Sequence, residues 1–221
     1  MKAMILAAGR GERLRPLTDT LPKPLIQIGK HRLIEYHLTR LAKNGFQEVI
    51  INLSHLGSLI EETIGDGHRY GLNIRYSQEG EERMNTGGGI ANALPLLGDD
   101  PFLVVNADIY CEYEYRSIEL PQNADMHLIM VDNPKHNADG DFTYLDNKLI
   151  NTSSTRLTFS GIGYYRPALF HERNGKFPLA DLIHEVITKD RCSAEHYIGY
   201  WSDVGTIERL NETKAYLDDL E

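Results

Sequence analysis

The sequence predicts an α/β fold in which a mixed, mostly parallel central sheet carries helices on both faces. Three observations support this prediction: short apolar runs recur along the first half of the chain, amphipathic segments separate them, and turn residues follow them. Alternation of this kind favours parallel strands, because each helix returns the chain to the same edge of the sheet. The expected strands lie at 2–6, 48–53, 72–77 and 102–106, with helices at 33–43, 56–64 and 88–97.

The helix expected at 33–43 has a regular apolar stripe. Leu33, Ile34, Leu38 and Leu41 recur at helical spacing, which indicates one face turned toward a core. Asn44-Gly45 follows directly and is typical of a helix C-terminus.

A different pattern begins near residue 107. β-like runs at 127–131 and 158–165 lie on either side of a polar stretch at 133–141, and a hairpin is expected at 142–150. We expect these segments to form a small antiparallel addition that supplies one wall of a substrate site. A helix near 179–189, a strand at 195–201 and a closing helix at about 206–219 complete the prediction.

Composition narrows the function classes. The 221 residues carry a net charge of −9, which argues against sequence-independent binding of nucleic acid. Residues 10–32 contain six Lys or Arg and two acids, a local charge of +4, so the remainder carries −13. An acidic protein with its positive charge concentrated in one segment is expected to bind a small anion there.

Two further features bear on location. Cys111 and Cys192 are the only cysteines and lack metal or redox spacing, as expected in a reducing compartment. No apolar stretch approaches the ~20 residues of a membrane span, and the N-terminal run is too short for a signal peptide. We therefore expect a cytoplasmic protein without membrane partners, whose oligomeric state stays open and for which a monomer is plausible.

The segment after the first strand combines small residues with guanidinium groups. Its small residues are Ala7, Ala8, Gly9 and Gly11, and its arginines are Arg10, Arg13 and Arg15. Small residues let backbone N–H groups approach an anion, and arginines neutralise a polyphosphate. Lys23 follows, fixed between Pro22 and Pro24. The combination predicts a nucleoside triphosphate site, with Glu12 inside the same loop.

Two other phosphate-binding loops do not match. A dinucleotide-binding loop requires a third glycine where this chain has Leu14, and Pro16 follows shortly. A Walker loop requires Gly-Lys followed by Ser or Thr, which occurs nowhere in the sequence.

Gly9, Gly11, Arg13, Pro22 and Lys23 together resemble the signature of the sugar nucleotidyltransferase family, a Gly-x-Gly-x-Arg loop followed by Pro-Lys. The resemblance implies a single Rossmann-like nucleotidyltransferase domain over 1–221. Within it, 1–105 would mainly bind the nucleotide, 106–203 would mainly bind the sugar, and 204–221 would form a closing helix.

Two aspartates are the expected metal ligands. Asp108 directly follows an apolar strand, where sites form in open α/β sheets, and Asp203 lies in Trp201-Ser-Asp-Val-Gly-Thr206 before the closing helix. The resemblance extends to both segments and implies Mg²⁺ bound by Asp108 and Asp203. Without the resemblance, Asp108 could serve a turn and Asp203 could cap the helix.

Candidate substrate contacts lie elsewhere along the chain. Asn85-Thr-Gly-Gly-Gly-Ile90 opens a helix, and its glycines could offer a flat surface to a base or form an ordinary turn. The nucleotide-binding candidates here are Glu79, Thr86, Gly87 and Gly88. The sugar-binding candidates are Asn106, Asp132, Asp141, Gly161 and Glu195, each of which could instead be a polar or turn residue of a loop.

Nearly the whole chain also resembles the bacterial N-acetylmuramate-1-phosphate uridylyltransferases of cell-wall recycling. The supporting segments include Leu33-Ile-Glu-Tyr-His-Leu38, Val131-Asp-Asn-Pro134 and Leu157-Thr-Phe-Ser-Gly161. The chain departs from the expected pattern at Asn85 and at Asn106-Ala107-Asp108, and it has no second lysine in a Val-x-Glu-Lys segment. Arg156 is a candidate for the contact that this lysine would make.

The resemblance implies transfer of UMP from UTP to a sugar 1-phosphate with release of pyrophosphate. Arg13 and the loop amides would hold the β- and γ-phosphates, and Lys23 would neutralise both the α-phosphate and the incoming phosphate of the acceptor. A mannose-1-phosphate guanylyltransferase, another sugar-1-phosphate nucleotidyltransferase and a non-catalytic module that binds sugar nucleotides are the alternatives.

Overall fold

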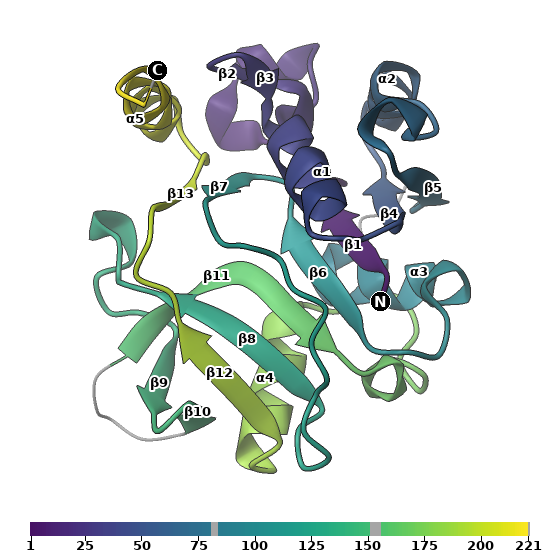
Figure 1. Ribbon diagram of the computed structural model, residues 1–221, viewed down its shortest axis with the longest axis vertical. Coiled ribbons are helices and arrows are strands. Elements are labelled where there is room, and N and C mark those ends of the chain that lie inside the picture. The colour runs from purple at the N-terminus through teal and green to yellow at the C-terminus, as the bar shows by residue number, and fades with distance from the viewer. Residues whose placement is uncertain (81–83, 151–155, 221) are drawn as a thin grey trace.

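The structure is a computed structural model that describes residues 1–80, 84–150 and 156–220 (Figure 1). Its largest feature is a nine-stranded mixed sheet of order β5-β4-β1-β6-β11-β8-β12-β10-β9. The strands are β1 (Ala3–Leu6), β4 (Glu48–Leu53), β5 (Asn73–Gln78), β6 (Phe102–Asn106), β8 (Met126–Val131), β9 (Phe142–Leu145), β10 (Lys148–Ile150), β11 (Arg156–Tyr165) and β12 (Cys192–His196).

The first half of the sheet is parallel, as expected. Strand β1 lies between β4 and β6, with Leu6 opposite both Asn52 and Asn106. The carboxyl ends of these strands therefore meet at one edge, where loops of an α/β sheet form sites.

The sheet as a whole is mixed, as predicted: β8 and β12 pair in parallel, and antiparallel pairings lie on either side of them. Strand β11 is antiparallel to both β6 and β8, and the β9–β10 hairpin adds further antiparallel pairings. The hairpin turns at Asp146 and Asn147, both with positive φ, as its sequence indicated. Strand β11 also pairs with β9, the last strand in the order, so the strands from β11 to β9 close on themselves. The antiparallel part is therefore larger than the small addition that was expected.

Helices cover both faces of the sheet. They are α1 (Leu33–Lys43), α2 (Gly57–Ile64), α3 (Asn85–Leu97), α4 (Leu179–Thr188) and α5 (Ile207–Asp218). Helices α1 and α2 share one hydrophobic core, whereas α3 and α4 share another. Figure 1 shows α1 in front of the sheet and α4 behind it. Along β1, Ile5 faces the first core and Met4 the second, which is the alternation of a strand buried on both sides.

The strand expected at 195–201 is divided between two sheets. Strand β12 ends at His196, the backbone N–H of Tyr197 still donates to Met130, and β13 (Trp201–Asp203) then pairs antiparallel with β7 (Ile109–Cys111). The long-range pairing with β7 draws the chain away from the main sheet. A second small sheet joins β2 (Gln27–Ile28) to β3 (His31–Arg32).

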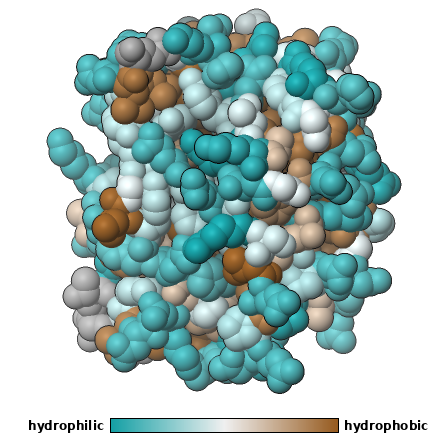
Figure 2. Space-filling view, in the orientation of Figure 1, coloured by the Kyte–Doolittle hydropathy of each residue, from teal (hydrophilic) through white to brown (hydrophobic). Residues whose placement is uncertain are grey.

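Short 3₁₀ helices occupy several connections: η1 (Glu12–Leu14), η2 (Leu17–Asp19), η3 (Lys23–Leu25), η4 (His68–Tyr70), η5 (Lys135–Asn137) and η6 (Pro167–Leu169). The face of the molecule drawn in Figure 2 is largely hydrophilic, with hydrophobic residues in small separate groups. None of the helices among the described residues has the length and apolar character that a membrane crossing requires.

The burial of each side chain predicts how much its replacement by alanine will destabilise the fold. Ile5 is fully buried in the central strand, so Ile5→Ala is expected to lower the free energy of unfolding by about 2–5 kcal/mol. Leu145 on β9 is 53% exposed, and Leu145→Ala is expected to change it by less than about 0.5 kcal/mol. Urea denaturation of both variants measures the difference, and equal losses would contradict this assignment of the core.

Candidate active site

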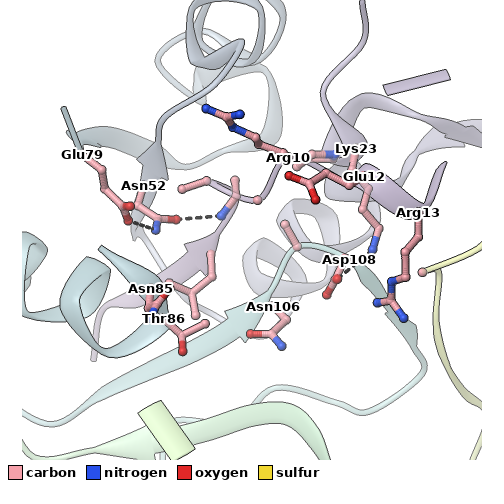
Figure 3. A pocket seen from close by; sticks show the side chains of 18 of the residues that line it. Arg10, Glu12, Arg13, Lys23, Asn52, Glu79, Asn85, Thr86, Asn106 and Asp108 are labelled. Carbon is pink, nitrogen blue, oxygen red and sulfur yellow. Dashed lines mark hydrogen bonds and ion pairs between the residues drawn. The ribbon is translucent and has the colours of Figure 1, made fainter. Parts of the chain in front are cut away.

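A pocket of about 650 Å³ lies at the carboxyl ends of β1, β4 and β6 (Figure 3). Its polar side chains are Arg10, Glu12, Arg13, Lys23, Asn52, Glu79, Asn85, Thr86, Asn106 and Asp108. The segment that was predicted to bind a triphosphate thus lies across the pocket from residues that follow β6.

The loop at 9–14 is shaped by one glycine and one buried leucine. Gly11 has a φ of +64°, and a Cβ at this position would lie 2.9 Å from Cγ2 of Thr18. The Gly11 carbonyl accepts hydrogen bonds from the Leu14 backbone and the Thr18 hydroxyl, both at 2.8 Å. With Leu14 fully buried, the exposed Arg10 and Arg13 project from a fixed backbone.

Lys23 forms an ion pair with Asp108 inside this pocket. Its Nζ lies 2.7 Å from Oδ2 of Asp108, and the lysine is only 6% exposed. The 3₁₀ turn η3 sets the position of Lys23, and the φ of each neighbouring proline is restricted by its ring. A buried ammonium requires a partner, and here the Asp108 carboxylate provides it.

Asp203 lies beside Asp108 because β13 pairs with β7. Asp203 is opposite Ile109, and the Val204 N–H donates to the Asp108 carbonyl at 2.8 Å. Asp203 itself does not line the pocket, although Gly205 does. The structure therefore brings the two predicted metal-ligand segments together from distant parts of the sequence.

Arg209 and His136 flank the Asp203 carboxylate. Arg209 Nη2 lies 3.0 Å from Oδ2, and Arg209 Nε donates to the Asp203 carbonyl at 2.9 Å. His136 Nε2 lies 3.1 Å from Oδ1. This last contact lacks hydrogen-bond geometry, so Oδ1 is buried without a hydrogen bond from any described residue.

A buried carboxylate oxygen that accepts no hydrogen bond from a described residue is a suitable ligand for a cation. No cluster of three or more His, Cys, Asp or Glu ligands occurs in the part of the chain that the structure describes. Mg²⁺ is commonly held by one or two carboxylates together with substrate phosphates and water, so Asp108 and Asp203 are compatible with Mg²⁺.

Asn52 and Glu79 continue the polar lining on the other side. Asn52 Oδ1 accepts from the Ala7 backbone at 2.7 Å, and Asn52 Nδ2 donates to Oε1 of Glu79. Burial raises the pKa of Glu79, and the hydrogen bonds from Asn52 and the Met84 backbone oppose that shift. Sequence reasoning missed Asn52, although a lone polar side chain in the apolar strand 48–53 could have indicated it.

Gly87 and Gly88, which were expected to offer a surface to a base, are buried and do not line the pocket. A Cβ at Gly87 would lie 2.3 Å from the Phe177 ring, and one at Gly88 would lie 2.4 Å from the Gly175 carbonyl oxygen. Both glycines allow the segment 175–178 to pack on α3. Thr86 does line the pocket, and its Oγ1 also accepts from the Leu179 backbone.

Gly161 has a local packing role next to Asn106. It lies in the irregular part of β11 between Phe159 and Ile162, with a φ of +82°. A Cβ there would lie 2.6 Å from Nδ2 of Asn106. Asn106 lines the pocket, whereas Gly161 does not. The role of Gly161 is to leave room for the Asn106 side chain.

Asp132, Asp141 and Glu195 do not line the pocket and have other partners. Asp132 lies 2.9 Å from His196, and Glu195 pairs with Arg116 and His127, which hold the pKa of Glu195 below its usual range despite its burial. Asp141 accepts hydrogen bonds from Asn137 and from the Phe159 backbone. Their expected role as direct sugar contacts is not supported by these positions.

His136 and Arg209 are further residues that sequence reasoning did not single out. His136 lies in the polar stretch 133–141, and Arg209 lies in the first turns of the closing helix. No sequence motif marks either residue. The contact of each with Asp203 depends on how distant strands pair.

Comparisons with known proteins show the family of the chain. A family model described as "Nucleotidyl transferase" matches residues 2–138. N-acetylmuramate alpha-1-phosphate uridylyltransferase of Neisseria meningitidis serogroup B is 47% identical over 97% of each chain. UTP–glucose-1-phosphate uridylyltransferase of a Synechocystis species is 40% identical over 49% of this chain and 30% of that protein.

Solved structures show the same fold. A putative glucose-1-phosphate thymidylyltransferase from Bacillus anthracis aligns with a TM-score of 0.87, at 18% identity, over 100% of this chain and 96% of that chain. A UDP-glucose pyrophosphorylase aligns with a TM-score of 0.77, also at 18% identity, over 100% of this chain and 99% of that chain.

The buried Glu79 predicts a pH-dependent stability. Because folding raises its pKa, the folded state holds this proton more tightly, and stability falls as pH rises from the unfolded pKa toward the folded one. Glu79→Gln removes that loss, so its stability relative to the parent protein is expected to increase as pH rises. Urea denaturation from about pH 4 to about pH 8 measures this. The exposed Glu62→Gln is the control, and parallel curves for Glu79→Gln and the parent would contradict the prediction.

Proposed function

Because this chain belongs to the nucleotidyl transferase family, we propose that it transfers UMP from UTP to N-acetylmuramate 1-phosphate. The products are UDP-N-acetylmuramate and pyrophosphate, which places the reaction in peptidoglycan recycling. The family resemblance read from the N-terminal loop and Lys23 is confirmed. Similarity over 97% of both chains to a uridylyltransferase of this specificity supports the choice of substrates.

The observation that carries the proposal is the ion pair of Lys23 with Asp108, two residues that both line the pocket. The arginine-bearing loop and residues that follow β6 line the same pocket as this pair. We assign Arg13 and the loop amides to the β- and γ-phosphates, and Lys23 to the α-phosphate. Arginine and lysine serve such roles because they neutralise charge that develops on phosphate oxygens.

The reaction needs positioning more than proton transfer. An oxygen of the acceptor phosphate forms a bond to the α-phosphorus of UTP, and the bond from that phosphorus to the bridging oxygen breaks. Pyrophosphate leaves with the electron pair. A phosphate monoester is already an adequate nucleophile, so the residues of the pocket act by orienting the two substrates and stabilising charge.

Asp108 and Asp203 would hold Mg²⁺. When bound, the ion would neutralise phosphate charge during the transfer. Lys23 is paired with Asp108 in the structure, so Lys23 becomes available to phosphate when the ion compensates that carboxylate.

A substrate panel tests the proposed function. Pyrophosphate release with Mg²⁺ is measured for UTP or GTP, each paired with N-acetylmuramate 1-phosphate or mannose 1-phosphate. Turnover is expected only with UTP and the muramate, and removal of Mg²⁺ with EDTA is expected to abolish it. GTP is included because curated mannose-1-phosphate guanyltransferases match part of the chain, such as that of Neurospora crassa at 36% identity over 53% of this chain. Preference for GTP and mannose would overturn the substrate assignment.

Substitution of Lys23 tests the assigned roles. Lys23→Ala is expected to reduce turnover by about 10²–10³-fold, because a contact that strengthens in the transition state is lost. Lys43→Ala removes an exposed lysine at the end of α1 and is expected to leave turnover unchanged. Thermal unfolding of both variants controls for folding. Near-parent turnover of a folded Lys23→Ala protein would show that the roles are wrong.

A further inference from the structure

The polar stretch that follows β8 is held by a network of side-chain hydrogen bonds. Its members are Asn133, Asn137, Asp141 and Thr158. Asn137 Nδ2 lies 3.0 Å from Asp141 Oδ1 and 3.1 Å from Thr158 Oγ1, and Thr158 donates in turn to Asn133. Both carboxylate oxygens of Asp141 are engaged, since Oδ2 accepts from the Phe159 backbone at 2.8 Å. The network fixes η5, a short turn with no buried residue of its own.

The side chain that η5 places next to the site is His136. Its Nε2 lies 3.1 Å from Asp203 Oδ1, and the imidazole keeps 35% of its surface exposed. Arg209 already orients Asp203 through the carboxylate and the backbone carbonyl, and its side chain is 14% exposed. His136 makes no hydrogen bond to Asp203 among the described residues, and its imidazole is partly open to solvent.

The positively charged side chains that line the pocket come from one part of the sequence. Among the described lining residues, the cations are Arg10, Arg13 and Lys23, all from the N-terminal segment. His136 does not line the pocket itself, and it lies against Asp203 from the part of the chain that follows β8. The triphosphate alone carries several negative charges, so a donor from this other part of the chain would add to the binding of a second anionic substrate.

We propose that His136 binds the phosphate of the acceptor sugar 1-phosphate, moving from Asp203 to that phosphate when the site is loaded. This inference rests on the proposed function and specifies the residue that recognises the acceptor's phosphate. The imidazole N–H donates to a phosphate oxygen, and the network behind η5 determines where that donor lies.

The test separates acceptor binding from nucleotide binding in His136→Ala and His136→Gln. The KM for the sugar 1-phosphate is expected to rise about 10- to 100-fold in His136→Ala, the usual effect of losing a hydrogen bond to a charged group. His136→Gln keeps an N–H donor and is expected to recover part of that loss. The KM for UTP is expected to change less than about twofold in both.

Calorimetry provides a second readout that does not depend on turnover. The sugar 1-phosphate is titrated into enzyme that is saturated with Mg²⁺ and α,β-imido-UTP, in which the reacting bond cannot be cleaved. His136→Ala is expected to weaken acceptor binding by the same factor as in the kinetics and to leave binding of the analogue unchanged.

Lys135→Ala is the matched control, because it removes a full charge from the exposed neighbouring residue of η5. It is expected to behave like the parent protein. Asn137→Ala, which loosens η5, is expected to reproduce a smaller loss of acceptor affinity with unchanged UTP affinity.

Two results would overturn the inference: parent-like acceptor affinity in His136→Ala, or an equal loss in Lys135→Ala. A loss of affinity for UTP alone would also overturn it, because His136 would then act through Asp203 and not on the acceptor's phosphate. Failure of the proposed function is a separate result, namely no turnover of the parent protein with UTP and N-acetylmuramate 1-phosphate. The kinetics are then measured with whichever sugar 1-phosphate is turned over, and the calorimetry needs no turnover.

Discussion

Strands β1 and β6 pair in parallel with Leu6 opposite Asn106, and the candidate active site depends on this register. The Ala107 N–H donates to the Leu6 carbonyl at 3.1 Å, so the N-terminal loop and the Asp108 turn leave the sheet at the same point. A shift by one residue would exchange the residues that face the two cores on either side of the sheet, and the packing of both cores opposes this. The short distance from Lys23 to Asp108 follows from that pairing rather than from either loop alone.

The charges of the site are balanced in pairs. Lys23 lies beside Asp108 and Arg209 lies beside Asp203, so each carboxylate has a cation next to it in the protein itself. Asp108 and Asp203 would hold a divalent ion, which would supply positive charge next to both carboxylates, and Lys23 would then be available to a phosphate. Replacement of one partner alone would leave a poorly solvated charge, which is unfavourable in a partly buried site. This pairing gives a physical reason why metal and nucleotide are expected to bind together.

Local patterns predicted most of the secondary structure, because they depend on residues near one another in sequence. The bounds predicted for 33–43 and 48–53 match α1 and β4, and the turn at Asp146-Asn147 follows from residues that tolerate positive φ. Long-range packing decides what local patterns do not indicate: the segment 175–178 packs on Gly87 and Gly88, and β13 leaves the main sheet to pair with β7. The N-terminal motif was long enough to indicate the family, whereas His136 and Arg209 become recognisable only once the strands are paired.

A crystal structure with Mg²⁺ and α,β-imido-UTP tests the central claim most directly, that the paired charges of the site are exchanged for metal and phosphate. The account predicts that Lys23 Nζ donates to an α-phosphate oxygen and that Asp108 and Asp203 both coordinate the ion. It also predicts that the N-terminal loop with Arg13 encloses the β- and γ-phosphates. A complex in which Lys23 stays on Asp108 while the phosphates lie elsewhere, or in which other residues hold the ion, would contradict it.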